Sequence, residues 1–173
     1  MAGTFARLIL FVLALALTAC VSTGAVQVSQ PLAAPLTHKA VAFELSAATA
    51  ALAEHEEPMK AALEGGFQDA GLFEKVGEAG DLTIRVKIMA LDEGDSTARA
   101  MNMGGEAEIT LDVEVVDAKD TVLAKLTVTG NSARQSETKI MGRSLKWADK
   151  LTQRAVAAAV EQLADYLKNP GAS

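Results

Sequence analysis

The chain has 173 residues, of which 50% are hydrophobic and only 4% aromatic, so its core must be built mainly from aliphatic side chains. Sixteen lysine and arginine residues stand against 22 aspartate and glutamate residues, which gives a formal net charge of −6. An acidic chain without a basic run excludes a nucleic-acid-binding protein and a protein held on membranes by charge. The length suits one ordinary domain with a real core.

The N-terminal segment has the three-part organisation of a secretory signal peptide. Arg7 supplies the positive charge, residues 8–17 form an apolar run, and Thr18 and Ala19 are the small residues that precede a cleavage site. The apolar run is shorter than the ~20 residues of a membrane-spanning helix. We therefore expect residues 1–19 to be removed, which leaves 154 residues with 15 basic and 22 acidic side chains, a net charge of −7.

The end of this segment, Leu17-Thr18-Ala19-Cys20, resembles a bacterial lipobox, in which one aliphatic and two small residues precede a cysteine. The resemblance implies that a signal peptidase recognises Leu17, Thr18 and Ala19, and that Cys20 becomes acylated on its thiol and then on its new amine. Two or three acyl chains hold firmly, since each buried methylene contributes ~0.8 kcal/mol and one chain binds only marginally. Because Cys20 is the only cysteine, the processed protein has no disulfide and no free thiol.

The lipobox resemblance also implies a location. Val21 follows the cysteine, at the place where enterobacterial lipoproteins retained in the inner membrane carry an aspartate. We therefore expect a protein that is lipid-anchored on the periplasmic face of the outer membrane. An ordinary signal peptide that happens to precede a cysteine is the alternative.

The sequence predicts three parts: the signal peptide over residues 1–19, a lipidated cysteine with a flexible tether over residues 20–37, and a single α+β domain over residues 38–173. The tether is predicted because Pro31 and Pro35 stand among glycine, serine and threonine residues with only scattered apolar positions. At ~3.1 Å per residue, an extended tether of this length would span ~50 Å.

The domain is expected to begin with a strand and helical segments. Residues 38–45 alternate between apolar and polar side chains, which predicts a strand. Ser46 is a candidate N-cap for an alanine-rich helix that follows. Pro58 either kinks this helix or stands in the first turn of a new one, and the acidic pair before it favours the new helix. Gly71 is the expected end of that helix.

Four further strands are predicted, one short and three long. Each long segment alternates apolar with polar side chains, as a strand with one buried face does. In the first long strand, residues 81–91, Ile88 and Ala90 are expected on the same buried face. A tight turn over residues 117–120 joins the last two strands into a hairpin. The predicted strands comprise residues 72–76, 81–91, 106–116 and 121–129.

A long helix closes the predicted domain. Apolar side chains recur at helical spacing over residues 144–167, and Asn169-Pro170-Gly171 ends the helix. The order of elements predicts an α+β fold. We expect a mixed or antiparallel sheet of about four to five strands, with two main helices packed on one face.

The outward sides of the three long strands carry charges of both signs. Basic side chains on the outer two strands would stand beside acidic ones on the middle strand, and such pairs contribute roughly 0.2–1 kcal/mol each. Helices cover only the other side of the sheet, so this face is expected to be wet. A merely solvated face is one interpretation. The functional one is a partner-binding face made of Arg85, Lys87, Glu108, Thr110, Asp112 and Lys125.

The sequence lacks a recognisable catalytic set. A Ser–His–Asp triad needs an imidazole buried in a cleft. His38 lies at the junction with the tether and His55 lies among glutamates, so both are expected to be solvated surface residues. We therefore predict that the protein is not an enzyme and that it uses no cofactor.

Metal ligands are equally sparse. Asp92, Glu93 and Asp95 offer oxygen ligands for a hard cation, but their spacing is not that of an EF-hand. Met101 and Met103 offer thioethers to Cu(I), although flexible packing is the ordinary role of methionine. We predict no metal site.

Residues 81–130 resemble a broad class of uncharacterised bacterial lipoproteins that carry a small α+β domain. The resemblance rests on a loop that runs from Arg99 to Gly104-Gly105, a strand that closes with Val116-Asp117, a turn and a return strand. It implies a binding or accessory role for another cell-envelope component, with an envelope protein as partner and no catalytic residue. A small-ligand or metal carrier in the periplasm is the alternative.

Overall fold

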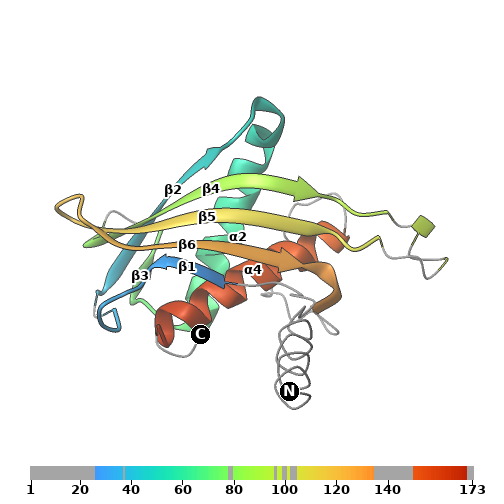
Figure 1. The fold of residues 1–173 in the computed structure, drawn as a ribbon. Helices are drawn as coiled ribbons and strands as arrows, with labels where there is room; N and C mark the ends of the chain where they lie inside the picture. The colour runs from blue at the N-terminus through green and yellow to red at the C-terminus, as the bar shows by residue number, and fades with distance from the viewer. Residues whose placement is uncertain are drawn as a thin grey trace, which may run out of the picture.

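The computed structural model describes residues 26–36, 38–77, 80–95, 97–98, 101, 105–134 and 150–170. Within these ranges the chain forms a six-stranded mixed sheet with two α-helices packed against it. In Figure 1 the sheet lies in front and both helices lie behind it. The predicted α+β layer is confirmed, although six strands replace the expected four to five. The signal peptide and Cys20 lie outside the described residues.

The strands follow the order β1-β6-β5-β4-β2-β3 across the sheet. Three of them, β4, β5 and β6, form an antiparallel meander, and β1 pairs antiparallel with β6. Strand β2 runs parallel to β3 and β4, because a helix between them returns the chain to the end of the sheet where β2 began. The strands are β1 (Val26–Gln30), β2 (Ala40–Ala47), β3 (Lys75–Val76), β4 (Leu82–Asp92), β5 (Glu108–Asp117) and β6 (Val122–Asn131).

The helical segments follow β2 and β6. Pro58 stands in the first turn of a new helix, as the acidic residues before it predicted, and Gly71 at φ 62° ends that helix. The alanine-rich segment before it is a 3₁₀ helix rather than an α-helix. The start of the last predicted helix lies outside the described residues. The segments are η1 (Ala50–His55), α2 (Glu56–Ala70), η2 (Ser132–Arg134) and α4 (Lys150–Lys168).

The core lies between the sheet and the two α-helices, α2 and α4. Alternate side chains of the long strands point into it, and each is at most 3% exposed. On α2, Phe67 places its ring edge-on to Phe43 and stacks on Phe73, with centroids 5.2 and 5.9 Å apart. The buried strand residues are Leu82, Ile84, Val86, Ile88, Ile109, Leu111, Val113, Val115, Ala124, Leu126 and Val128.

One prediction about strand faces is wrong. Ala90 was expected beside Ile88 on the buried face, but the pairing of β4 with β5 shifts register between these two residues. A β-bulge at this point adds one residue to β4 and reverses the alternation. Ala90 and Met89 are both exposed as a result.

The predicted tether over residues 20–37 also needs correction, because part of it belongs to the sheet. Val26 pairs with Val128 of β6, and Leu32 is 9% exposed and donates its N–H to the Tyr166 hydroxyl at 3.2 Å. The apolar signal of β1 is only two valines long, too short to identify a strand. Residues 26–30 form a strand because they pair with the edge of β6 and satisfy the hydrogen-bonding groups of its backbone.

Helix α4 lies directly on the backbone of β6 at Gly130. A Cβ atom built on Gly130 would lie 2.0 Å from the carbonyl oxygen of Ala155 and 2.8 Å from the Cβ of Ala159. Both neighbours belong to the buried side of α4, and one of them is a backbone atom that cannot move aside alone. Glycine is therefore required at this position by close approach rather than by its backbone angle.

We expect Gly130→Ala to lower the free energy of unfolding by the upper end of the ~1–3 kcal/mol typical of overpacking, or more. Chemical denaturation of the purified protein measures this change. The control is Gly71→Ala, which meets no atom within 4 Å and loses only the left-handed preference of glycine, about 1 kcal/mol. Equal losses in the two variants would contradict the close contact.

Candidate functional site

One face of the sheet, which no helix in the described part of the chain covers, carries a row of alternating charges. Glu44 of β2, Arg85 of β4, Glu114 of β5 and Lys125 of β6 lie opposite one another in turn. Arg85 binds Glu44 with 2.8 Å between Nε and Oε2, and Lys125 pairs with Glu114. The predicted juxtaposition is confirmed for Glu114 and Asp112, and the register extends it to β2. Glu108 lies opposite Asp92 and Asn131 instead of a basic side chain.

A second row runs beside the first. Lys87 lies opposite Asp112, whose Oδ1 accepts a hydrogen bond of 2.8 Å from the Thr127 hydroxyl. Lys87 and Glu108 are exposed, and neither forms an ion pair or side-chain hydrogen bond with another residue in the described part of the chain. Thr110 is partly buried opposite Thr129. The charges of Lys87 and Glu108 are therefore the groups most available to a partner.

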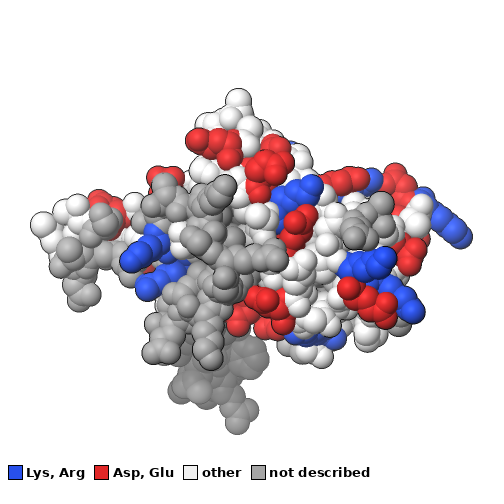
Figure 2. All heavy atoms as spheres, turned by 180° about the vertical axis from the view of Figure 1, so that it is seen from behind, with Lys and Arg blue, Asp and Glu red and all other residues white. Residues whose placement is uncertain are grey.

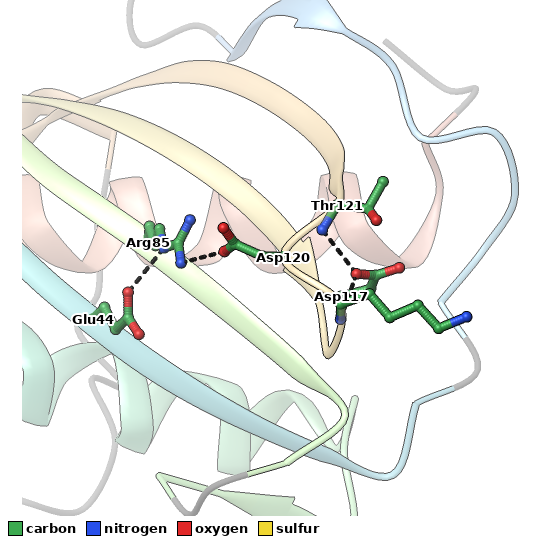
Figure 3. A network of polar contacts seen from close by, with 6 residues as sticks. Glu44, Arg85, Asp117, Asp120 and Thr121 are labelled. Atoms are coloured by element: carbon green, nitrogen blue, oxygen red, sulfur yellow. Dashed lines mark hydrogen bonds and ion pairs between the residues drawn. The ribbon is translucent and has the colours of Figure 1, made fainter.

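Arg85 has a structural role in addition to its place on the face. Its second nitrogen, Nη2, binds Asp120 at 2.6 Å, so one guanidinium joins β2, β4 and the β5–β6 turn (Figure 3). The hydrogen bond to Glu44 raises the pKa of Arg85, and the bond to Asp120 raises it further. Asp120 has φ 65°, a conformation that aspartate adopts more readily than most residues. Arg85 therefore stays positively charged, and two carboxylates already balance its charge.

The β5–β6 turn is closed by Asp117. Its Oδ1 accepts the backbone N–H groups of Thr121 and Lys119, each at 2.8 Å (Figure 3). These bonds, with Thr121 first, lower the pKa of Asp117 below its ordinary 3.8. The ionised carboxylate is the form that accepts both bonds, so the turn is most stable at pH values above 3.8, where Asp117 is ionised.

The sheet face was predicted from three strands, and two residues that organise it were missed. Glu44 and Asp120 both bind Arg85, yet they lie 41 and 35 positions away from it in the sequence. No local pattern joins these three residues, because a parallel crossover and a turn bring them together. Of the predicted site residues, the structure places Arg85, Lys87, Glu108, Thr110, Asp112 and Lys125 on the three central strands, all on this face.

On the opposite side of the molecule, the described residues show no comparable order of charges. In Figure 2, which looks from behind, acidic and basic side chains are interspersed over a largely uncharged surface. Acidic side chains gather where η1 passes into α2, which is where Glu54, Glu56 and Glu57 lie. The strand registers therefore make the sheet face the more organised polar surface.

The histidines are less exposed than predicted. The His55 side chain is 17% exposed and its Nε2 lies 4.0 Å from Glu54, and His38 is half-buried. Among the described residues, no group of three or more His, Cys, Asp or Glu side chains is placed to hold a metal ion. Met101 is 64% exposed, and Met103 and Arg99 lie outside the described residues.

An open hollow of about 470 Å³ lies beside the C-terminal end of α4. It is lined by residues 32–35, which follow β1, and by residues 168–170.

The helices that the structure describes were also compared with the length and hydropathy of a membrane span. None of them meets both requirements.

These features define an α+β domain with one bare, charged sheet face, and comparison with known sequences gives its family. Residues 28–136, more than half of the chain, match the family described as a domain of unknown function (DUF4410), and the chain belongs to that family. The matched region begins within β1, in agreement with the place of that strand in the domain. No curated protein matches the chain.

Solved structures share the fold at low sequence identity. Two PelC dodecamer structures from Paraburkholderia phytofirmans superpose with TM-scores of 0.55 and 0.53 at 13% and 14% identity. In both cases the match covers 84% of this chain and 97% of the other. A minor lipoprotein from Acinetobacter baumannii matches at 12% identity over 77% of this chain and 94% of its own, with a TM-score of 0.41.

We expect Asp117→Asn to flatten the acid limb of the stability profile. A carboxyl group with a lowered pKa in the folded state stabilises above its unfolded pKa, and this contribution is lost as the pH falls through the folded pKa. The wild-type free energy of unfolding should thus fall more steeply below pH 3.8 than that of the variant. Urea denaturation at several pH values measures the difference.

The matched control is Asp69→Asn, which changes an exposed carboxyl on α2. This residue accepts no hydrogen bond from the described part of the chain. Parallel profiles for wild type and Asp117→Asn would show that the turn does not depend on the ionised carboxylate.

Proposed function

We propose that this protein is a lipid-anchored module of the bacterial cell envelope, held at the periplasmic face of the outer membrane through acylated Cys20. In this proposal its domain binds another envelope protein and assists that protein's work. The lipobox resemblance of Leu17-Thr18-Ala19-Cys20 supports the anchor. The uncovered, charged sheet face supports the binding role and is the observation that carries it.

The chemistry of this face favours a protein partner. Charges of opposite sign alternate from strand to strand, at the ~4.8 Å spacing of neighbouring strands. Such a surface complements another surface of mixed charge and selects its register, whereas a uniformly charged polymer meets repulsion at every second position. Lys87 and Glu108 are the groups free to form new pairs, because Arg85, Glu114 and Lys125 already have partners within the sheet.

Assembly with further copies is a second candidate. The two PelC structures with the same fold are dodecamers. We extend this to the present chain as a proposal that its module works as an oligomer. The partner on the sheet face is then either a different envelope protein or a neighbouring copy, and the same experiment distinguishes them.

The alternative of a small-ligand or metal carrier would use the hollow beside α4 or the thioethers of Met101 and Met103. The hollow is open, and its lining includes only one charged residue, Lys168. Elemental analysis of protein purified from membranes separates this alternative from the binding module, since a stoichiometric metal would favour a carrier.

The lipid anchor is tested by Cys20→Ser. We expect this variant to lose the mass of its acyl chains and to move from the membrane to the soluble fraction, because no other cysteine can accept the lipid. Intact-mass spectrometry and cell fractionation measure both changes. Val21→Asp in an enterobacterial host is the matched control, and it should stay acylated but accumulate in the inner membrane. An unmodified wild-type protein would refute the anchor.

The binding face is tested by a photoreactive residue at Lys87 or Thr110 in intact cells. Both positions should crosslink to the same protein, which mass spectrometry identifies as an envelope protein or a second copy. A probe at Asp69, exposed on α2, is the control and should not capture it. Glu108→Lys should reduce the yield from Lys87 several-fold if the charges select the partner. Equal capture from Asp69 would contradict a specific sheet face.

A further inference from the structure

The membrane anchor and the sheet are separated by very little chain. Strand β1 begins at Val26, so only residues 21–25 lie between it and Cys20. A residue spans at most ~3.6 Å, and Val26 therefore lies within about 22 Å of Cys20 in any conformation. The tether expected from the sequence would have allowed ~50 Å. An acylated Cys20 thus holds the folded domain at the bilayer surface.

The direction of β1 decides which end of the sheet lies nearer the lipid. Val26 pairs with Val128 near the end of β6, whereas Gln30 pairs with Lys125 near its start. At the Val26 side, β4 ends and β5 begins, and we call this the β4–β5 end of the sheet (Figure 1). The opposite end carries the β5–β6 turn with Asp120 and, beside α4, the open hollow.

The same β4–β5 end carries exposed apolar side chains. Met89 is 38% exposed and Met101 is 64% exposed, and they are the exposed large hydrophobic residues of the described part of the chain. Met89 lies at the bulge of β4, in the next position to Ile88, whose row across the sheet also contains Leu111, Val128 and Val26. Met101 lies in the connection between β4 and β5, where its N–H bonds to the Thr97 carbonyl.

We propose that the β4–β5 end docks on the bilayer, with Met89 and Met101 at the lipid–water interface. This inference rests on the proposed anchor at Cys20. Flexible thioether side chains adapt to an irregular apolar boundary, and burial of even part of them adds to the affinity of the acyl chains. Two independent observations support this orientation: the end of the short link and the position of the exposed methionines.

The charges near this end restrict the kind of lipid surface. Asp92, Glu93 and Asp95 lie between the two methionines in sequence and are exposed or partly exposed. Carboxylates stay in water and are repelled by anionic headgroups. The proposed surface is therefore zwitterionic, with shallow contact. In this orientation the Asp120 turn and the hollow face away from the membrane, and the charged sheet face is left open at the side for a protein partner.

The test uses the acylated protein, purified from membranes and reconstituted into phosphatidylcholine–phosphatidylethanolamine vesicles that contain brominated lipid. Met101→Cys and Ala34→Cys each provide one free thiol, because Cys20 is blocked by its lipid. Both positions are exposed, one at each end of the sheet. With a fluorescent label on each, we expect lipid quenching to be several-fold stronger at position 101 than at position 34. Equal quenching, or stronger quenching at position 34, would overturn the orientation.

Two further measurements separate the possible failures. A protein that remains in solution after reconstitution would show that the anchor itself is absent, which is a failure of the proposed function. A bound protein whose label at position 101 is unquenched, and which forms crosslinked dimers there, would show that a second copy covers the methionines instead. Replacing part of the phosphatidylcholine by phosphatidylglycerol should reduce quenching at position 101 about twofold or more, and increased quenching would contradict the zwitterionic surface.

Discussion

The structure depends on the burial of one side of a strongly alternating sheet. Each long strand presents apolar residues to one side and polar residues to the other, and α2 and α4 cover the apolar side. Helix α4 approaches β6 closely because Gly130 has no side chain that would meet Ala155 and Ala159. Once the apolar side is buried in this way, every polar side chain of the central strands must emerge on the opposite face. The candidate binding surface is thus a direct consequence of core formation.

Register turns those polar side chains into an ordered surface. Antiparallel pairing of β4, β5 and β6 sets Arg85 against Glu114 and Lys125 against Glu114, and parallel pairing of β2 adds Glu44. Exposed ion pairs of this kind contribute little to stability, because water screens them and side-chain entropy opposes them. Their effect is on specificity: paired residues are fixed in position, and Lys87 and Glu108 remain as charges without partners in the described part of the sheet.

The inclusion of β1 in the sheet bears on the proposed membrane anchor. A strand that starts at Val26 leaves a short link to Cys20, so the domain cannot extend far from the lipid that the lipobox implies. The same strand protects the edge of β6, and Leu32 then closes the core against Tyr166. One segment thereby closes the sheet edge and, in the proposed anchoring, orients the domain, although its sequence resembles a linker. The family match, residues 28–136, begins within this strand.

Features that depend on neighbours along the chain could be predicted from local sequence patterns. Alternation predicted the three long strands and their buried faces as far as Ile88 in the first of them, and Pro58 and Gly71 predicted the start and end of a helix. The anchor that the lipobox resemblance implies remains a prediction. Other features depend on contacts between segments that are distant in the sequence. The place of β1 depends on the edge of β6, with which it pairs. The exposure of Ala90 depends on a bulge in the pairing of β4 with β5. Arg85 binds residues that lie 35 and 41 positions away in the sequence. These features arise from pairing between distant segments, and backbone pairing of this kind leaves no local signal in the side chains.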